Sequence, residues 1–342
     1  MDRSPSQISL PKKKVLLVIG NGFDLDMGLR TSYMNFVESD FFKVMVDSSI
    51  PNPVEIFEGV DEEKMQLRPN GLALHVQKKA EHKNWVDLEE CIREYCELQY
   101  DKHADRELLR KELFAMRYML YHYLASSVNY RFEERNQFFK NHISYRLLDG
   151  IVHGGVDYQI WDFNYTFTCE IILEWLHVDS KDIQNRLHYI HGQLRKEDGA
   201  ERWPIVLGSN STSKIQNICP SAIKCNTSNY YDNARTFKDE ISKASVIVFM
   251  GHSMGSTDSP YFRDMLVSPK MEAIAIITKS ENSLDEFRAN INEVTDNLYA
   301  QLKERPALRE ISFVSDGYYE PFNTFNSSKW KEFDDIMNRI MH

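Results

Sequence analysis

The stretch from Lys14 to Gly22, KVLLVIGNG, decides the fold of this chain. Its first six residues form an apolar run rich in Val and Ile, which is typical of a strand covered on both faces of a sheet. A Gly-Asn-Gly turn ends the run, and the spacing of Tyr33, Phe36 and Phe41 indicates a helix after it. A buried strand, a glycine turn and a helix are the first unit of an α/β fold.

The same alternation returns in the second half of the chain. Further strands are expected at residues 158–163, 187–190, 204–207, 245–250, 273–278 and 311–314. Helices are expected at residues 166–176, 230–243, 259–266, 283–303 and 330–340. Repeated strand–helix units imply a doubly wound, mainly parallel sheet, so the predicted fold class is α/β.

Between these parts, residues 81–150 show helical patterns and no convincing strand. We therefore expect one discontinuous α/β domain, residues 14–342, with a helical subdomain inserted at about 81–150. Residues 47–80 contain three prolines and are expected to form an irregular loop or insertion. Residues 1–13 are expected to be a flexible polar arm.

The composition limits the classes of function. The chain has 342 residues, of which 42% are hydrophobic and 27% charged, and a formal net charge of −10. A protein that coats nucleic acid is usually basic, so nucleic acid is not expected as a direct ligand. No stretch approaches the ~18 apolar residues of a membrane helix, and five cysteines are too few for a disulfide framework. We expect a cytoplasmic protein without membrane contact.

Polar, glycine-marked segments follow four of the predicted strands: Gly20–Asp24, Phe163–Thr166, His191-Gly192 and Gly251–Asp258. Ligands bind to such sheets where the carboxyl ends of strands meet the following loops, so the shared location predicts a ligand cleft. No metal is expected, because the histidines form no metal-binding motif and strand spacing puts His188 on the opposite face from His191.

Each segment has a structural interpretation beside the functional one. Gly20 and Gly22 let a phosphate approach the backbone, or they serve only a tight turn. Asp24 would bind ribose hydroxyls or face water. Asn164 would hold a water or a ribose hydroxyl, or would cap the helix that follows. The residues alone leave these alternatives open.

Gly251–Gly255, GHSMG, also matches the Gly-x-Ser-x-Gly signature of serine hydrolases, with Ser253 as the nucleophile. In that fold the acid and the histidine follow the serine, and here the only later histidine is the terminal His342. A chain terminus is a poor place for a general base. A backbone loop around a nucleotide is therefore favoured over a hydrolase site.

Taken together, these segments resemble a known family. VLLVIGNGFDLDMGLRTSYMNF, at Val15–Phe36, is similar to the opening signature of the AbiH family of bacterial phage abortive-infection proteins. FNYT at Phe163–Thr166, IHG at Ile190–Gly192 and GHSMGSTD at Gly251–Asp258 resemble its later blocks in the same order. The resemblance spans about residues 15–280 and is weak in the helical insertion.

The order of the blocks is also similar to the sirtuin-like fold, a Rossmann variant that binds NAD. The resemblance implies that the nucleotide is bound by Gly20, Asn21, Gly22, Phe23, Gly251, His252, Ser253 and Asp258. It implies that Asn164 positions water, that His191 is the catalytic base and that Asp24 stabilises positive charge on the ribose. Thr166 stands where that fold usually has Asp. The zinc-binding cysteine quartet of the deacylases is absent, which argues against protein deacylation.

What this resemblance implies about function is an anti-phage protein that hydrolyses NAD, its substrate, to nicotinamide and ADP-ribose without a metal. An enzyme that depletes NAD must be held inactive in healthy cells, so a homo-oligomer or a partner protein of the defence system is expected. The alternative from another class is a non-catalytic sensor that binds NAD or ADP-ribose and signals to a partner.

Overall fold

The computed structural model describes most of the chain. The described residues are 12–53, 65–81, 87–127, 139–194, 205–224, 243–255, 258, 262, 266, 268–295, 309–315 and 327–342. The predicted N-terminal arm lies outside them except for residues 12 and 13. The helix predicted at 230–243 lies outside them except for residue 243, as does most of the helix predicted at 259–266.

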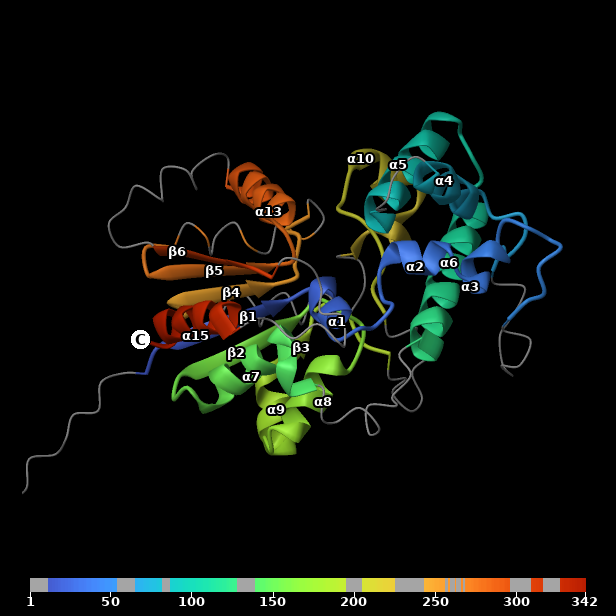
Figure 1. The fold of residues 1–342 in the computed structure, drawn as a ribbon. Coiled ribbons are helices and arrows are strands. Elements are labelled where there is room, and N and C mark those ends of the chain that lie inside the picture. The colour runs from blue at the N-terminus through green and yellow to red at the C-terminus, as the bar shows by residue number, and fades with distance from the viewer. Residues whose placement is uncertain are drawn as a thin grey trace, which may run out of the picture.

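One six-stranded parallel sheet forms the centre of the molecule, in the order β3-β2-β1-β4-β5-β6 (Figure 1). Its strands are β1 (Lys14–Ile19), β2 (Asp157–Asp162), β3 (Leu187–Tyr189), β4 (Val246–Met250), β5 (Ala273–Thr278) and β6 (Arg309–Val314). The chain moves outward from β1 to β3 on one side and from β4 to β6 on the other. The point between β1 and β4 is therefore the topological switch point, where sheets of this order bind ligands.

Both faces of the sheet are covered, as the apolar run of β1 predicts. Val15, Leu17 and Ile19 belong to one core, with α7 (Ile143–His153), α8 (Thr168–Trp175), α9 (Ser180–Arg186) and α15 (Ser327–Met341). Leu16 and Val18 belong to the opposite core, with α13 (Glu281–Val294). Alternate side chains of a strand point to opposite faces, which explains the division. Figure 1 shows α13 on one side of the sheet and α15, α7, α8 and α9 on the other. The predicted α/β fold class is confirmed.

A second group of helices stands on the side of the sheet where β1 ends and α1 (Asn21–Asp26) begins (Figure 1). We call this group the helical layer. It comprises α2 (Tyr33–Val37), α3 (Asp40–Lys43), α4 (Gly71–Ala80), α5 (Leu88–Asp101), α6 (Arg106–Ser127) and α10 (Ser213–Ile218), with a shared hydrophobic core. Short 3₁₀ turns, η3 (Phe139–Asn141) and η4 (Pro220–Ala222), precede α7 and follow α10. The layer draws on residues before and after 81–150, and the boundaries of an inserted domain stay a prediction.

Three local predictions are corrected by the structure. The supposed loop at 47–80 contains α4, whose first turn is capped by Asn70 through a hydrogen bond from the Ala73 N–H (2.9 Å). Residues 204–207 form no sheet strand in their described part, because Ile205 makes only an isolated antiparallel bridge to Gly192. The helix predicted at 166–176 begins at Thr168, since the residues before it are used at the edge of the sheet.

Candidate functional site

The two glycine loops that follow β1 and β4 touch each other at the switch point. The N–H of Gly20 donates to Met250 O (3.0 Å), and the N–H of Gly22 donates to Gly251 O (2.9 Å). A Cβ on Gly20 would lie 2.5 Å from the His252 Cα, so a side chain has no room there. Gly251 has φ +63°, which favours glycine. The contact between the loops is thus a sufficient structural reason for both glycines.

Asn164 connects the end of β2 to the first of these loops. Its Nδ2 donates to Gly20 O (3.1 Å), and its backbone N–H donates to the Asp162 carboxylate (2.8 Å). It does not cap a helix, because α8 starts at Thr168 after Phe167, with no capping hydrogen bond from a side chain. The cap interpretation of Asn164 is therefore wrong, and the side chain lies at the strand ends.

Asp24 is buried beneath the same loop, with 1% of its surface exposed, so it does not face water. The Thr166 hydroxyl donates to its Oδ2 (2.7 Å), while its Oδ1 has no hydrogen-bond partner among the described residues. Burial raises the pKa of Asp24 to about 6, and hydrogen bonds from Thr166 and Thr168 limit the rise. The pKa of the neighbouring Asp162 is raised well above its ordinary value, by burial and by the charge of Asp24.

These raised values make a prediction about stability. The folded-state pKa of Asp24 is about 6 against an ordinary 3.8, so ionisation costs the folded state more than the unfolded state. The associated stability is present below the ordinary value and is lost as the pH rises through about 6. In urea unfolding between about pH 4.5 and pH 7.5, Asp24→Asn should lose less stability than the wild type, by on the order of 2 kcal/mol. Parallel stability curves for the two proteins would contradict the assignment.

A buried ionic cluster lies beside the glycine loops. Lys224 Nζ is 2.6 Å from Glu89 Oε2, 2.8 Å from Asp258 Oδ1 and 3.3 Å from His191 Nε2. His191 Nε2 is also 3.1 Å from Asp258 Oδ1. Only 1% of the Lys224 side chain and 6% of the His191 side chain are exposed, against 14% for Asp258. We call these four residues the Lys224 cluster.

Separate elements bring the members of the cluster together. Glu89 lies in the first turn of α5, which Asp87 caps by accepting hydrogen bonds from the N–H groups of Glu89 and Glu90 (3.0 Å each). His191 follows β3, and Asp258 belongs to the segment after β4. The backbone of Lys224 is fixed because its N–H donates to Ser209 O (3.1 Å). The cluster therefore joins the helical layer to the carboxyl ends of the strands.

Charge decides which members of the cluster are ionised. Burial by itself would lower the pKa of Lys224, but the carboxylates of Asp258 and Glu89 outweigh burial and hold it above its ordinary value. Burial would raise the pKa of Asp258, but Lys224 and His191 hold it well below its ordinary value. Burial raises the pKa of Glu89 to about 8 despite Lys224. Burial and the Lys224 cation lower the pKa of His191. At neutral pH the cluster thus holds a Lys224–Asp258 ion pair and a neutral His191 imidazole.

Aromatic rings close the cluster on the side of the sheet. The Phe163 ring packs edge-on against His191 (centroids 5.2 Å apart) and against His252 (4.5 Å). The His252 ring accepts a hydrogen bond from the Met254 N–H at Nδ1 (3.0 Å) and faces Asp258 with Nε2 (3.5 Å). Both ring nitrogens of His252 are therefore used within the loop.

The Ser253 side chain is exposed at the edge of this loop. Its carbonyl accepts a hydrogen bond from Asn290 (2.7 Å). No imidazole among the described residues is hydrogen-bonded to its hydroxyl, and the neighbouring His252 is turned to Asp258. The part of the chain that the structure describes thus offers Ser253 no activating base, as a serine nucleophile requires.

Sequence reasoning placed most of these residues at one edge but missed two of them. The structure brings Gly20, Gly22, Gly251, His252 and Asn164 together, and it pairs His191 with Asp258. Asp24 lies beneath the loop and Ser253 outside it. Lys224 and Glu89 were not predicted, because neither stands in a motif or follows a strand. An Asp87 helix cap beside two acidic residues was the only local signal near Glu89.

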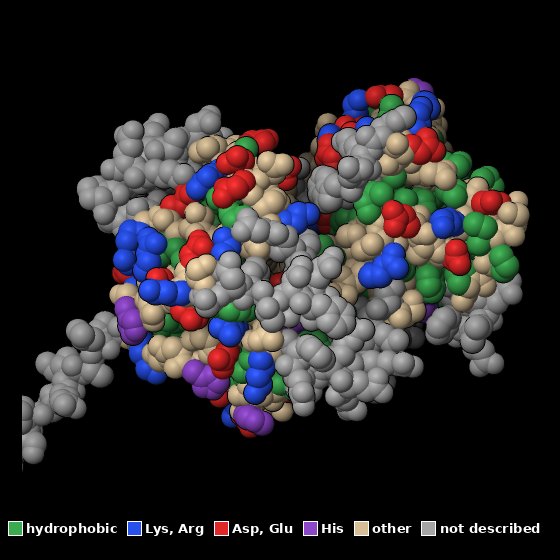
Figure 2. Space-filling model, viewed as in Figure 1, with side chains coloured by type: hydrophobic (Ala, Val, Ile, Leu, Met, Phe, Trp, Pro, Cys, Tyr) green, Lys and Arg blue, Asp and Glu red, His purple; other side chains and the backbone are tan. Residues whose placement is uncertain are grey.

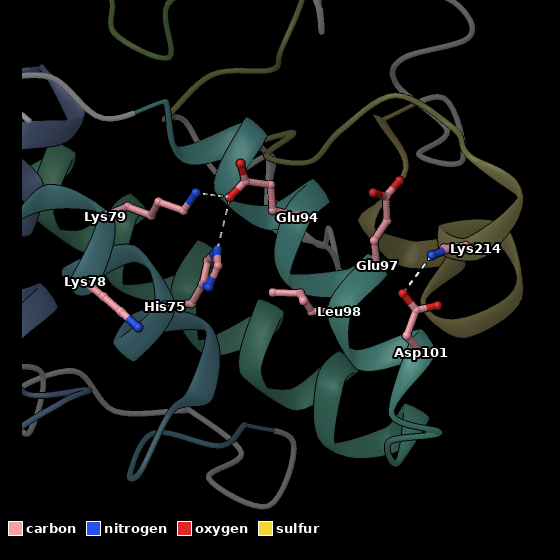
Figure 3. Close-up of a pocket in the computed structure, with 8 residues that line it drawn as sticks. All are labelled: His75, Lys78, Lys79, Glu94, Glu97, Leu98, Asp101 and Lys214. Atoms are coloured by element: carbon pink, nitrogen blue, oxygen red, sulfur yellow. Dashed lines mark hydrogen bonds and ion pairs between the residues drawn. The ribbon is translucent and has the colours of Figure 1, made fainter. Parts of the chain in front are cut away.

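A hollow of about 650 Å³ lies elsewhere, within the helical layer. Figure 3 shows that its lining residues come from α4, α5 and α10. Its charged groups are paired with each other, as in Lys79 with Glu94 (2.6 Å) and Lys214 with Asp101 (2.7 Å). It shares no residue with the Lys224 cluster, so nothing connects it to the strand ends.

The surface carries charges of both signs. Figure 2 shows acidic and basic side chains interspersed over the described part of the sheet layer and of the helical layer. This face therefore lacks the continuous basic surface that binds nucleic acid. Within the described residues, no group of three or more His, Cys, Asp or Glu side chains is placed to hold a metal ion. None of the described helices has the length and apolar character needed to span a membrane.

Comparison with protein families places the chain. Residues 16–279 match the profile of the family described as bacteriophage abortive infection AbiH. The matched region runs from β1 through β5 and includes both glycine loops and every member of the Lys224 cluster. A search of curated proteins found no significant match. Because the family profile covers well over half of the chain, this protein belongs to the bacteriophage abortive infection AbiH family.

Proposed function

We propose that this protein defends the cell against phage by binding NAD across the carboxyl ends of β1, β2 and β4 and hydrolysing its nicotinamide–ribose bond. One observation carries the proposal. At the switch point of a sheet with dinucleotide-binding strand order, Asn164 is bonded to the Gly20 loop and His191 lies beside the segment that follows β4. A backbone amide loop, a carboxamide and a neutral imidazole are the groups that such a cleavage needs.

The chemistry assigns one task to each group. Water attacks the ribose carbon C1′ as nicotinamide leaves with the electrons of the C–N bond. Asn164 uses its Nδ2 on Gly20, so its Oδ1 accepts a hydrogen bond from the attacking water. His191 is neutral and accepts the proton of that water. The products are nicotinamide, ADP-ribose and a proton.

Binding requires a local exchange of hydrogen bonds. The amides of Gly20 and Gly22 already donate to Met250 and Gly251, so a pyrophosphate can accept from them only when the loops separate. We therefore expect NAD to increase hydrogen exchange in residues 251–255. The same closed contact favours the second candidate, a sensor whose loops separate on binding NAD or ADP-ribose without turnover.

The decisive experiment incubates the purified full-length protein with NAD and quantifies nicotinamide and ADP-ribose by chromatography. We expect both products in equal amounts, together with a thermal shift on adding NAD. A thermal shift without products would favour the sensor. Neither a shift nor products would overturn NAD binding at this edge. Labelling of Ser253 by a fluorophosphonate would instead support a serine hydrolase, and we expect none.

A further inference from the structure

Lys224 meets every other ionisable member of the cluster with one ammonium group. An ammonium has three N–H donors, and Glu89, Asp258 and His191 are three acceptors within 3.3 Å of it. Two of these contacts come from opposite sides, because Glu89 belongs to the helical layer and Asp258 to the segment after β4. The position of the cation is therefore fixed from both layers.

We propose that Lys224 is a positioning residue for His191, whose imidazole it keeps neutral by holding a fixed cation against Nε2. Protonation of the ring would place an imidazolium 3.3 Å from the Lys224 ammonium. Asp258 opposes this effect, since its Oδ1 lies 3.1 Å from the same nitrogen and favours the protonated ring. The catalytic meaning of this role rests on the proposed function, in which His191 is the base. The protonation state itself does not.

The other groups that face His191 do not replace Lys224. His252 is close enough to disfavour a second positive charge, and the Tyr165 ring lies with its centroid 6.3 Å from that of His191. The Tyr165 hydroxyl donates to Val206 O (3.1 Å) rather than to the imidazole. Glu89 acts through Lys224, by fixing its ammonium (2.6 Å). The balance on Nε2 is thus set by one cation and one anion, Lys224 and Asp258.

The test is an NMR titration of histidine side chains in the full-length protein, with the His191 signal assigned from its loss in His191→Gln. Lys224→Met removes the cation and retains the length of the side chain. We expect the His191 titration to move to higher pH in Lys224→Met and to lower pH in Asp258→Asn. Lys224→Arg keeps the charge and should titrate near the wild type. Lys214→Met removes an exposed lysine of α10 as a matched control and should change nothing.

The two variants move the titration in opposite directions, which loss of structure would not do. If Lys224→Met fails to fold, the Asp258→Asn and Lys224→Arg titrations still decide. An unchanged or lowered His191 titration in a folded Lys224→Met protein would overturn the proposal, as would an unchanged titration in Asp258→Asn.

Kinetics then separate this proposal from the proposed function. In Lys224→Met the acid limb of kcat/KM for nicotinamide release should move to higher pH with the NMR titration. On that limb, each pH unit of displacement lowers the rate about tenfold. Opposite NMR shifts with no nicotinamide release by any variant, including the wild type, would leave Lys224 as the positioning residue and refute NAD cleavage. Release by the wild type with no NMR shift would do the reverse.

Discussion

Replacing His191 by Ala should lower the rate of nicotinamide release by about 10²- to 10⁴-fold, the usual contribution of a general base. The buried imidazole is kept neutral beside Lys224 and Asp258, so it is ready to accept a proton at neutral pH. Its loss should affect kcat much more than the affinity for NAD, because a base acts in the transition state. Single-turnover rates and calorimetric binding of NAD would measure the two effects separately.

His188 provides a matched control for this variant. It lies three residues earlier, in β3, and its Nε2 contacts the Gln159 amide (2.9 Å) instead of the cluster. His188→Ala should therefore retain the wild-type rate. His191→Gln, which preserves polar contacts without a base, should be as slow as His191→Ala. Wild-type turnover by His191→Ala would remove His191 from the mechanism.

Replacing Gly251 by Ala should destabilise the protein by about 2–5 kcal/mol, as the sum of left-handed backbone strain and overpacking. The residue has φ +63°, and an added Cβ would lie 2.3 Å from the Gly22 Cα, where only backbone surrounds it. The two loops would have to move apart, which would also break the bond from the Gly22 N–H to Gly251 O (2.9 Å). Urea unfolding of the wild type and the variant would measure the loss.

Gly28 separates the two contributions. It has a similar φ of +78°, but nothing lies within 4 Å of an added Cβ. Gly28→Ala should therefore cost only the backbone strain, about 1–2 kcal/mol. Equal losses for Gly251→Ala and Gly28→Ala would show that the loops are not in tight contact in solution.

The extent of sequence prediction follows from the range of the interactions involved. The apolar runs of β1, β4 and β5 identify strands covered on both faces, because burial depends on the side chains of the strand itself. Residues 71–80 were missed, because the prolines before them dominated the local pattern. The Asn70 cap and the apolar spacing of Leu72 and Val76 were the available signals for this helix.

The candidate site divides in the same way. His191, Asn164 and Gly251 follow strands, and the ends of parallel strands meet at one edge, so their proximity follows from the fold class. The cap interpretation of Asn164 was plausible locally. It is wrong because a carbonyl 144 positions away in the chain, that of Gly20, takes its amide.

By itself, then, the sequence determined the α/β class, the positions of the central strands, the edge at which the glycine loops gather and the resemblance to the AbiH family. Only the tertiary structure decided that Gly22 bonds to Gly251, that Asp24 is buried and that Lys224 pairs with Glu89, Asp258 and His191. Strand patterns and motifs are local, so they can be read along the chain. The charge on His191 depends on a lysine 33 positions away and on a helix of another layer, whose approach no local pattern encodes.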